Sequence, residues 1–359
     1  MRALCFAAIA LAFAVPASAH AASAGVGRNT LTFEAGPGEA NRVSIATAPG
    51  VFRIADAGAA IVPGVGCRSL TPQAVECERR RVQLLIVRLG DGNDTVSASV
   101  GIPTRLNGGD GDDLLEGTEV DDILRGGPGA DHLFGSDGFD TLEGGPGPDL
   151  LSGGTEAVVR EIPLEFDFVS YTSRTAGVRV TIDGIADDGE PGEGDNVLPD
   201  VEVVLGGRGN DVLIGNDGFV NAFAGGRGND TLVGLGGDID LLFGERGRDD
   251  LSGGAGVDIL DGGRGDDILR GGSGDDELTG GGGRDSLSGG SGEDDLRVRD
   301  RERDVVIGGS GYDFAIVDGK RLDLVLGVEE AVRPGARVRP PLTGRVARRA
   351  RAGLSRVLD

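Results

Sequence analysis

The sequence predicts an all-β fold made by stacking one short unit many times. Between Gly244 and Arg297 the chain repeats every nine residues, six times without a break. Each unit has glycine at its first and fourth places, aspartate at its sixth and leucine at its eighth. A period of nine fits neither a helix, at about 3.6 residues per turn, nor a plain strand, at about two. We therefore expect each unit to form a six-residue turn followed by a very short strand.

The leucine at the eighth place explains why the units must stack. It is the central residue of the short strand and is expected to point inward. One unit alone buries one leucine, which cannot offset the entropy lost by ordering nine residues. Stacked neighbours turn the leucines into a continuous column, as repeat proteins require. The alternative is a solvated glycine-rich linker, but a linker has no reason to keep a nine-residue register.

The aspartate at the sixth place points to a hard metal cation. Gly244–Arg297 contains fourteen acidic residues and six arginines, a net charge of −8. Stacking brings these like charges together, which costs energy. Calcium takes about 6–8 oxygen ligands and mixes carboxylates with backbone carbonyls, which glycine turns expose. Magnesium fits less well because it favours strict octahedral geometry and retains waters.

Two blocks carry the repeat. The first covers Gly108–Ser152 in five units, within residues 101–154. The second covers Gly206–Ile316 in twelve units, three of which hold one extra residue. Asn221 takes the sixth place in one of these three, so one position is neutral. The predicted calcium ligands are the sixth-place aspartates Asp113, Asp122, Asp131, Asp140, Asp149, Asp211, Asp230, Asp240, Asp249, Asp258, Asp267, Asp276, Asp285, Asp294, Asp304 and Asp313.

These units resemble the haemolysin-type, or RTX, calcium-binding nonapeptide repeats, whose pattern is G-G-x-G-x-D-x-U-x. The resemblance implies a parallel β-roll, in which two nonapeptides make one coil and several calcium ions lie between turns on both sides. It also implies that the sixth-place aspartates and nearby turn carbonyls supply the ligands. Many RTX proteins are exported through a C-terminal signal. This chain has a basic C-terminus instead, so export through the general secretory route is expected.

Residues 1–21 are predicted to be a cleavable signal peptide. Arg2 supplies a short positive region, Leu4 to Val15 is apolar, and a small-residue cleavage site ends at Ala19, with cleavage after Ala21 as the alternative. The apolar stretch is too short to span a bilayer. An N-terminal anchor is the less favoured interpretation. We expect an extracellular, secreted protein that is not integral to a membrane.

Residues 22–100 predict a small β cap, which a solenoid needs because its end leucines would otherwise face water. Cys5 would leave with the signal, so Cys67 and Cys77 form an even pair in an oxidising compartment and predict a disulfide. The cap runs into a degenerate first repeat that contains Asp94. Alternation and β-branched residues predict its strands at Asn29–Glu34, Asn41–Ala46, Val51–Ala55, Ala74–Cys77 and Val82–Leu89.

Three further segments depart from the period. In residues 155–205, Phe166–Thr172 and Val178–Ile182 are predicted to form a β-hairpin, followed by the acidic loop Asp183–Asp200. A solvated surface insertion is preferred there over an extra cation or partner site. Residues 317–332 predict a capping strand. Residues 333–359 hold eight arginines and one acidic residue, and a disordered or weakly helical tail is preferred over a contact with an anionic cell envelope.

Composition and motifs exclude several function classes. The net charge of −24 opposes nucleic-acid binding, which needs a basic face. Neither H-E-x-x-H nor G-x-S-x-G occurs, and His132 sits at a seventh place with no nucleophile pattern near it. With no tryptophan and two tyrosines, the chain lacks the aromatic side chains that usually wall a sugar-binding cleft.

The leading expectation is a secreted, non-catalytic protein whose β-roll folds on binding multiple Ca²⁺ ions. The alternatives are a cell-surface adhesion or envelope-interaction protein and, less favoured, an RTX-linked hydrolase. Calcium ions are the expected partner, with possible envelope contact through the basic tail. Circular dichroism during calcium titration and chelation tests the first expectation. Retention on cell envelopes with and without residues 333–359 tests the envelope-interaction alternative.

Overall fold

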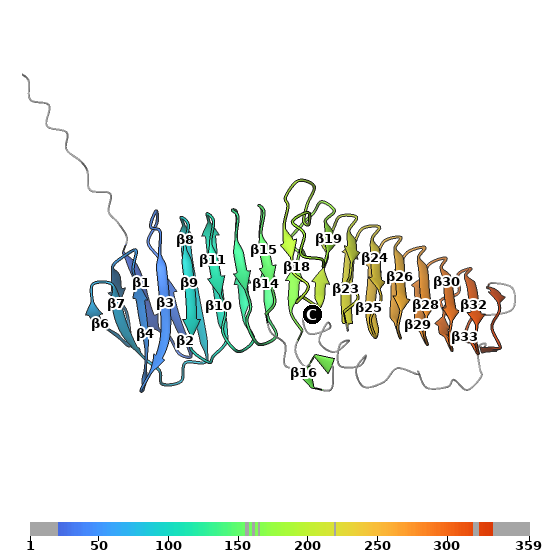
Figure 1. Ribbon diagram of the computed structural model, residues 1–359, viewed down its shortest axis with the longest axis horizontal. Helices are drawn as coiled ribbons and strands as arrows, with labels where there is room; N and C mark the ends of the chain where they lie inside the picture. Colours follow the sequence, from blue (N-terminus) through green and yellow to red (C-terminus); the bar gives the residue numbers. More distant parts are fainter. Residues whose placement is uncertain are drawn as a thin grey trace, which may run out of the picture.

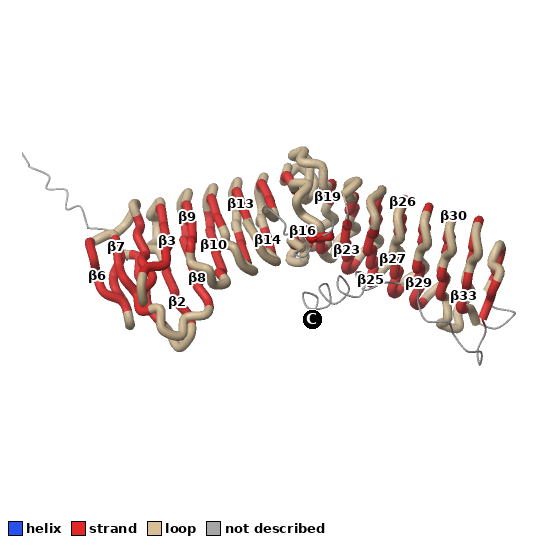
Figure 2. Tube along the Cα trace, turned by 60° about the horizontal axis from the view of Figure 1, so that its bottom comes forward, coloured by secondary structure: helices blue, strands red, loops and turns tan. Residues whose placement is uncertain are grey.

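The protein is an elongated roll with two facing walls of β-strands (Figure 1). The computed structural model describes residues 21–154, 158–159, 162–163, 166–218, 220–318 and 323–332. Within these ranges every regular element is a strand, and turns join the strands along the whole roll (Figure 2). No helix in the described part is long and apolar enough to cross a membrane. The predicted signal peptide, apart from Ala21, and the basic tail lie outside the described residues.

One wall is a 16-stranded sheet that runs the length of the molecule. All of its pairs are parallel except the pair of β1 with β2. In chain order its strands are β1 (Ala22–Val26), β2 (Thr30–Glu34), β5 (Ile61–Pro63), β8 (Leu84–Asp91), β10 (Thr104–Asp110), β12 (Ile123–Arg125), β14 (Thr141–Glu143), β18 (Phe168–Ser170), β21 (Val203–Leu205), β23 (Val220–Arg227), β25 (Ile239–Arg246), β27 (Ile259–Arg264), β29 (Glu277–Gly282), β31 (Asp295–Arg297), β33 (Phe314–Ile316) and β35 (Glu330–Val332).

The opposite wall is divided into two sheets. The 9-stranded sheet contains β3 (Arg42–Ala48), β4 (Val51–Asp56), β6 (Cys67–Thr71), β7 (Ala74–Glu78), β9 (Thr95–Ser99), β11 (Leu114–Glu116), β13 (His132–Phe134), β15 (Leu150–Ser152) and β20 (Asn196–Val197). The 8-stranded sheet contains β19 (Arg179–Thr181), β22 (Val212–Ile214), β24 (Thr231–Leu235), β26 (Asp250–Ala255), β28 (Ile268–Ser273), β30 (Ser286–Ser291), β32 (Val305–Ser310) and β34 (Leu324–Leu326). A separate two-stranded sheet joins β16 (Val158–Val159) and β17 (Ile162–Pro163).

Two nonapeptides make one coil, as the resemblance implies. Leu260 pairs with Leu278 in the 16-stranded sheet, and Leu269 pairs with Leu287 in the 8-stranded sheet. Successive units therefore alternate between the walls, and equivalent leucines lie one above the next. The eighth-place leucines of both blocks are fully buried in one continuous cluster. The prediction of an all-β parallel β-roll is confirmed.

The glycines are required because neighbouring coils approach closely at the turns. A Cβ atom at Gly262, a first-place glycine, would lie 2.6 Å from Oδ2 of Asp267 and 2.7 Å from the carbonyl oxygen of Gly280. Gly265, at a fourth place, has φ +148°, and a Cβ there would lie 1.3 Å from the carbonyl oxygen of Gly247. No L side chain fits either place without moving the next coil.

The cap closes the N-terminal end of the column and shares its core. β2 pairs in parallel with β8, and β3 with β9, so both walls continue from the roll into the cap. Phe33 and Phe52 are fully buried in the same cluster as the repeat leucines. Cys67 and Cys77 face each other across β6 and β7 and form the predicted disulfide.

Residues 166–205 differ from the hairpin expected from the sequence. β18 pairs with β14 and β21 in the 16-stranded sheet, whereas β19 pairs with β22 in the 8-stranded sheet. The chain then turns back to place β20 beside β15. The segment therefore supplies strands to the roll itself. The reason is that Val169, Val180 and Val197, each fully buried, take the inward places that leucine holds in regular units.

The C-terminal end of the roll is closed by two short strands within residues 317–332. β34 extends the 8-stranded sheet beside β32, and β35 extends the 16-stranded sheet beside β33. Ala315 holds the inward place of β33 and is fully buried.

Candidate metal sites in the turns

All sixteen predicted aspartates are buried at the edges of the roll. Each of these residues is 3% exposed or less. Their position follows from the repeat, because the sixth place is the last residue of the turn and points inward one step before the strand begins. A solvated acidic loop would leave these carboxylates in water. Their burial therefore requires a specific partner for the charge.

One carboxylate oxygen of each aspartate accepts a backbone N–H from the preceding coil and so keeps the two coils in register. The backbone N–H of Asp249 donates to Oδ1 of Asp267 at 2.9 Å, and the N–H of Asp267 donates to Oδ1 of Asp285 at 2.9 Å. The same bond recurs every 18 or 19 residues along both edges of the roll. The result is two ladders of backbone-to-carboxylate hydrogen bonds, one on each edge.

The other carboxylate oxygen has no hydrogen-bond partner in most units. Within the described residues, Oδ2 is buried and unpaired in fourteen of the sixteen aspartates. The exceptions are Asp122, whose Oδ2 accepts the Thr118 N–H, and Asp211, whose Oδ2 accepts the Gly207 N–H. A buried carboxylate oxygen without a partner is costly, so these fourteen positions demand a cation or a proton.

Burial raises the pKa of these carboxyls. Desolvation is the main cause throughout, and the carboxylate one coil away adds to it. The pKa of Asp140 and of Asp276 rises to about 8, and that of Asp249 to about 7. No ion pair between described residues involves a sixth-place aspartate. Without a cation, each ionised carboxylate makes ionisation of its neighbour in the ladder less favourable, so these groups lose their protons only near neutral pH.

Backbone carbonyls at the turns complete the donor set. A Cβ at Gly145 would lie 2.0 Å from the carbonyl oxygen of Gly127, and one at Gly147 would lie 1.8 Å from that of Gly129. The second- and fourth-place carbonyls therefore face the turn of the next coil. No hydrogen bond from a described residue ends on these two oxygens. Carbonyl and carboxylate oxygens that lack hydrogen-bond partners among the described residues are the kinds of ligand that calcium prefers.

Any cation in these turns would take most of its ligands from the backbone. Nowhere in the described ranges do three or more His, Cys, Asp or Glu side chains gather into a metal-ligand group. Asp249 and Asp267, for example, stand in successive coils of one ladder rather than around one point. This excludes an all-carboxylate cage and leaves a mixed site of one or two carboxylates with carbonyls.

The family comparison agrees with this geometry. The model of the RTX calcium-binding nonapeptide repeat, which spans four copies, matches residues 107–142, 134–156, 200–218, 220–238, 236–269 and 261–296. RTX calcium-binding nonapeptide repeats therefore occupy residues 107–156, 200–218 and 220–296. No curated protein sequence matches the chain.

The ladders extend beyond the RTX repeats that the sequence revealed. The N–H of Asp140 donates to Oδ1 of Asp167, and that of Asp149 donates to Oδ1 of Asp195. Asp94 takes the same role in the cap by accepting the N–H of Asn41. The sequence had indicated the degenerate unit of Asp94, but the continuations at Asp167 and Asp195 were missed. The further acceptors are Glu202, Asp323 and Glu329.

A local signal for two of them was present in the sequence. Asp167 and Asp195 each stand two residues before a buried valine, Val169 and Val197, which matches the last places of an RTX unit. Gly153, the first-place glycine of the broken unit, is a weaker signal because it lies far from Asp167 along the chain. A Cβ at Gly153 would lie 2.3 Å from Oδ2 of Asp167, so the first and sixth places still meet although the chain between them is longer.

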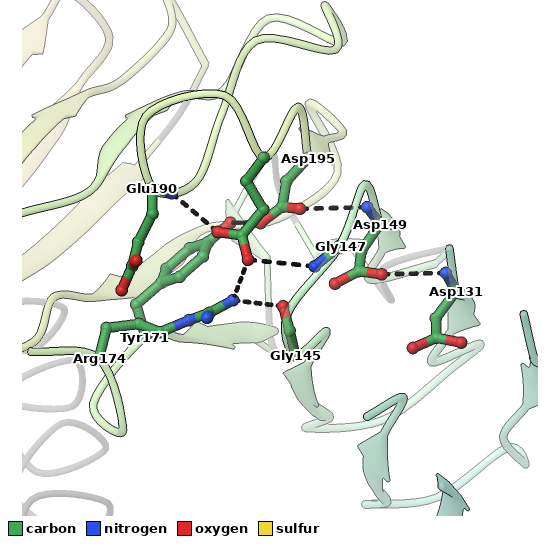
Figure 3. Close-up of polar contacts among 9 residues, drawn as sticks. Asp131, Gly145, Gly147, Asp149, Tyr171, Arg174, Glu190 and Asp195 are labelled. Atoms are coloured by element: carbon green, nitrogen blue, oxygen red, sulfur yellow. Dashed lines mark hydrogen bonds and ion pairs between the residues drawn. The ribbon is translucent and has the colours of Figure 1, made fainter. Parts of the chain in front are cut away.

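At the end of the first block, an arginine takes the position of a cation (Figure 3). Arg174 donates to the carbonyl oxygen of Gly145 and forms a partly buried ion pair with Glu193 at 2.6 Å. Oε1 of Glu193 in turn accepts the N–H of Gly147 at 3.2 Å. The second-place carbonyl of this turn thus contacts a guanidinium. A side-chain cation therefore satisfies the last turn of the first block.

The same junction contains a buried tyrosine and a carboxylate that joins the two sheets of the divided wall. Tyr171 donates its hydroxyl to Oδ2 of Asp195 at 2.9 Å. Asp188 accepts the N–H of Thr181, in β19, and the N–H of Val197, in β20. Burial raises the pKa of Asp188 to about 6. The Asp188 carboxylate therefore links β19 and β20, which belong to different sheets and do not pair through their backbones.

At Asn221, a neutral side chain stands in for the aspartate of an RTX unit. Its Nδ2 donates to Oδ1 of Asp240 at 2.7 Å and to the carbonyl oxygen of Gly234 at 3.2 Å. The amide N–H groups thus meet oxygens that have no such donor in regular units. His132, on β13, is exposed, and its ring meets the Phe134 ring edge-on.

Proposed function

We propose that this is a secreted, non-catalytic calcium-binding protein whose β-roll folds when several Ca²⁺ ions bind. The observation that carries the proposal is the pair of carboxylate ladders, in which fourteen buried Oδ2 atoms have no hydrogen-bond partner among the described residues. Calcium would supply the positive charge that these buried carboxylates require. Because the unfolded chain has no such preformed arrangement, the free energy of calcium binding becomes free energy of folding.

The proposed ligands are Oδ2 of the sixth-place aspartates and the carbonyl oxygens of the second- and fourth-place glycines. Asp122 and Asp211 contribute less, because backbone N–H groups already occupy both of their oxygens. Arg174 and Asn221 mark turns where a side chain supplies the N–H donors instead of an ion. The central coils of the second block, where the RTX period is unbroken, are expected to bind first.

Secretion and the absence of catalysis are parts of the proposal that rest on the sequence. Residues 1–21 have the charge, apolar stretch and small-residue site of a signal peptide, and the disulfide suits an oxidising compartment. Millimolar extracellular calcium would then meet the chain only after export, so that the roll would fold outside the cell.

Circular dichroism during calcium titration tests the proposal. The chain lacking residues 1–21 should show little β signal in excess chelator and gain it cooperatively as calcium is added. Magnesium at the same concentration serves as the control and should produce a much smaller gain. A β signal that excess chelator leaves unchanged would refute folding on calcium, and isothermal calorimetry on the same sample would show whether ions bind at all.

A further inference from the structure

The 16-stranded sheet carries an apolar patch on the face that points away from the core. We call it the outer stripe. Val169, Val204, Phe223, Leu242 and Leu260 belong to the main core cluster, and the residues that alternate with them form a second, separate cluster. Alternate residues of a strand point to opposite faces, so the second cluster lies on the outside. The outer stripe consists of Phe168, Val203, Leu205, Val220, Ala222, Ala224, Leu241 and Ile259, on strands β18, β21, β23, β25 and β27.

The outer stripe is buried although it faces outward. Leu241 is 0% exposed and Ile259 is 4% exposed. Ile268 holds the same seventh place on the opposite wall, one unit later, and is 37% exposed. Outside the stripe the 16-stranded sheet presents polar residues at these places, such as Thr141 and Glu143 on β14. A patch that is both apolar and buried over five neighbouring strands indicates a covering element.

We propose that residues 345–359 form an amphipathic helix that packs on the outer stripe. Val346, Ala350, Leu354 and Val357 recur at intervals of four, four and three, which places them on one face of a helix. The arginines of this segment, Arg345, Arg348, Arg349, Arg351 and Arg356, fall on the remaining faces. These residues lie outside the described part of the chain, and the proposal rests on the stripe and on the sequence.

The lengths agree with this placement. The described chain ends at Val332 in β35, the terminal strand of the same 16-stranded sheet. From β35 to β27 there are four strand spacings, about 19 Å at 4.8 Å each. Residues 333–344, if extended, can reach about 40 Å. A 15-residue helix is about 22 Å long, which matches the five strands of the outer stripe at about 19 Å between the first and the last.

Charge favours the same arrangement. Residues 333–359 hold eight arginines and one aspartate, a formal charge of +7, so the whole-chain charge of −24 leaves −31 for the rest. Exposed Asp217 and Asp238 border the outer stripe at the edge where β23 and β25 begin. In this arrangement the apolar face of the segment would pack on the outer stripe, and its arginines would lie toward the exposed aspartates at this edge. The tail would then be a component of the roll and not a free contact for the cell envelope.

Accessibility of a cysteine in the outer stripe tests the proposal. The variant Ala222→Cys would be made in a chain carrying Cys5→Ser and kept in excess calcium. A thiol reagent should label Cys at position 222 slowly in the full chain and at least about tenfold faster in a chain that ends at Val332. The matched control is Thr231→Cys, a seventh place on the opposite wall, whose labelling rate should be the same in both chains. Circular dichroism of both chains in excess calcium reports whether the shortened chain folds.

A second pair of variants locates the segment directly. On oxidation, Ala222→Cys with Ala350→Cys should form a disulfide, and Thr231→Cys with Ala350→Cys should not. If position 222 stays protected when residues 333–359 are removed, another segment covers the outer stripe and the proposal is wrong. It is also wrong if vesicles of phosphatidylserine and phosphatidylcholine bind the full chain through the tail while position 222 is labelled rapidly without them.

Discussion

Each sixth-place aspartate performs two tasks with its two oxygens. Oδ1 accepts a backbone N–H from the preceding coil, as between Asp249 and Asp267. Oδ2 of Asp267 is buried and lacks a hydrogen-bond partner among the described residues. An asparagine could keep the first task but not the second, because the amide carries no charge. Aspartate at this place therefore serves both the stacking of the coils and the binding of a cation.

Replacing Asp267 by asparagine should separate these tasks. The hydrogen bond to the Asp249 N–H can persist, while the calcium concentration at the folding midpoint should rise about tenfold because one charged ligand is lost. In chelator the variant should be no less structured than the parent chain. The measurement is circular dichroism against free calcium.

The neighbouring variant Asp266→Asn is the matched control. Asp266 occupies an exposed fifth place and pairs with Arg284, and its replacement should leave the calcium midpoint unchanged. Equal shifts for the two variants would contradict a ligand role for Asp267.

At the scale of elements, residues 166–205 join the two blocks of RTX repeats. The chain places β18 and β21 in one wall and β19 and β20 in the other, so the 16-stranded sheet stays continuous while the opposite wall divides. The divided wall is held by side chains, namely Asp188 between β19 and β20 and the Arg174–Glu193 pair against the last turn of the first block. These contacts need no ion, so the junction should be the part of the roll least sensitive to calcium.

Arg174→Ala should destabilise the calcium-loaded protein by about 3–5 kcal/mol, because it leaves the largely desolvated Glu193 carboxylate without its cationic partner. The two side chains of the pair are 12% and 8% exposed, so solvent screens the interaction little. The measurement is urea unfolding in saturating calcium. The double variant Arg174→Ala with Glu193→Gln should recover a large part of the loss, since no buried charge is then left alone. A loss below about 1 kcal/mol, as found for surface pairs, would contradict this role.

At the scale of the whole molecule, the roll concentrates negative charge along two buried lines. In the folded, calcium-free state, burial raises the pKa of Asp131 to about 6, of Asp285 to about 7 and of Asp149 to about 8. The ordinary aspartate value is 3.8. The folded state therefore binds more protons than the unfolded state between these values. Protons and calcium ions become alternative ways of neutralising the same groups.

The calcium-free chain should accordingly be more stable at pH 4.5 than at pH 8. For a raised pKa the stabilising contribution is fully present below the unfolded value and is lost as the pH rises through about 6 to 8. Calcium should reverse the dependence, because its ligands must be deprotonated, and the calcium midpoint should fall as the pH rises. Circular dichroism in chelator at the two pH values measures the first effect. A calcium-free β signal that grows with pH would contradict it.

The sequence by itself determined the parts of this protein that depend on local spacing. A nine-residue register fixes turn, strand, inward leucine and edge aspartate within each unit, and Asp249 and Leu251 illustrate it. The even cysteine pair likewise predicted the Cys67–Cys77 disulfide. These features follow from residues within one unit or one hairpin, where the chain itself sets the geometry.

The tertiary structure alone decided which distant residues complete the pattern. Asp167 and Asp195 continue the ladders because stacking places them one coil beyond Asp140 and Asp149, although 27 and 46 residues separate them along the chain. The burial of Leu241 on an outer face is equally a property of three-dimensional packing. Contacts between coils depend on how many residues each coil uses, and that number changes wherever the nine-residue period breaks.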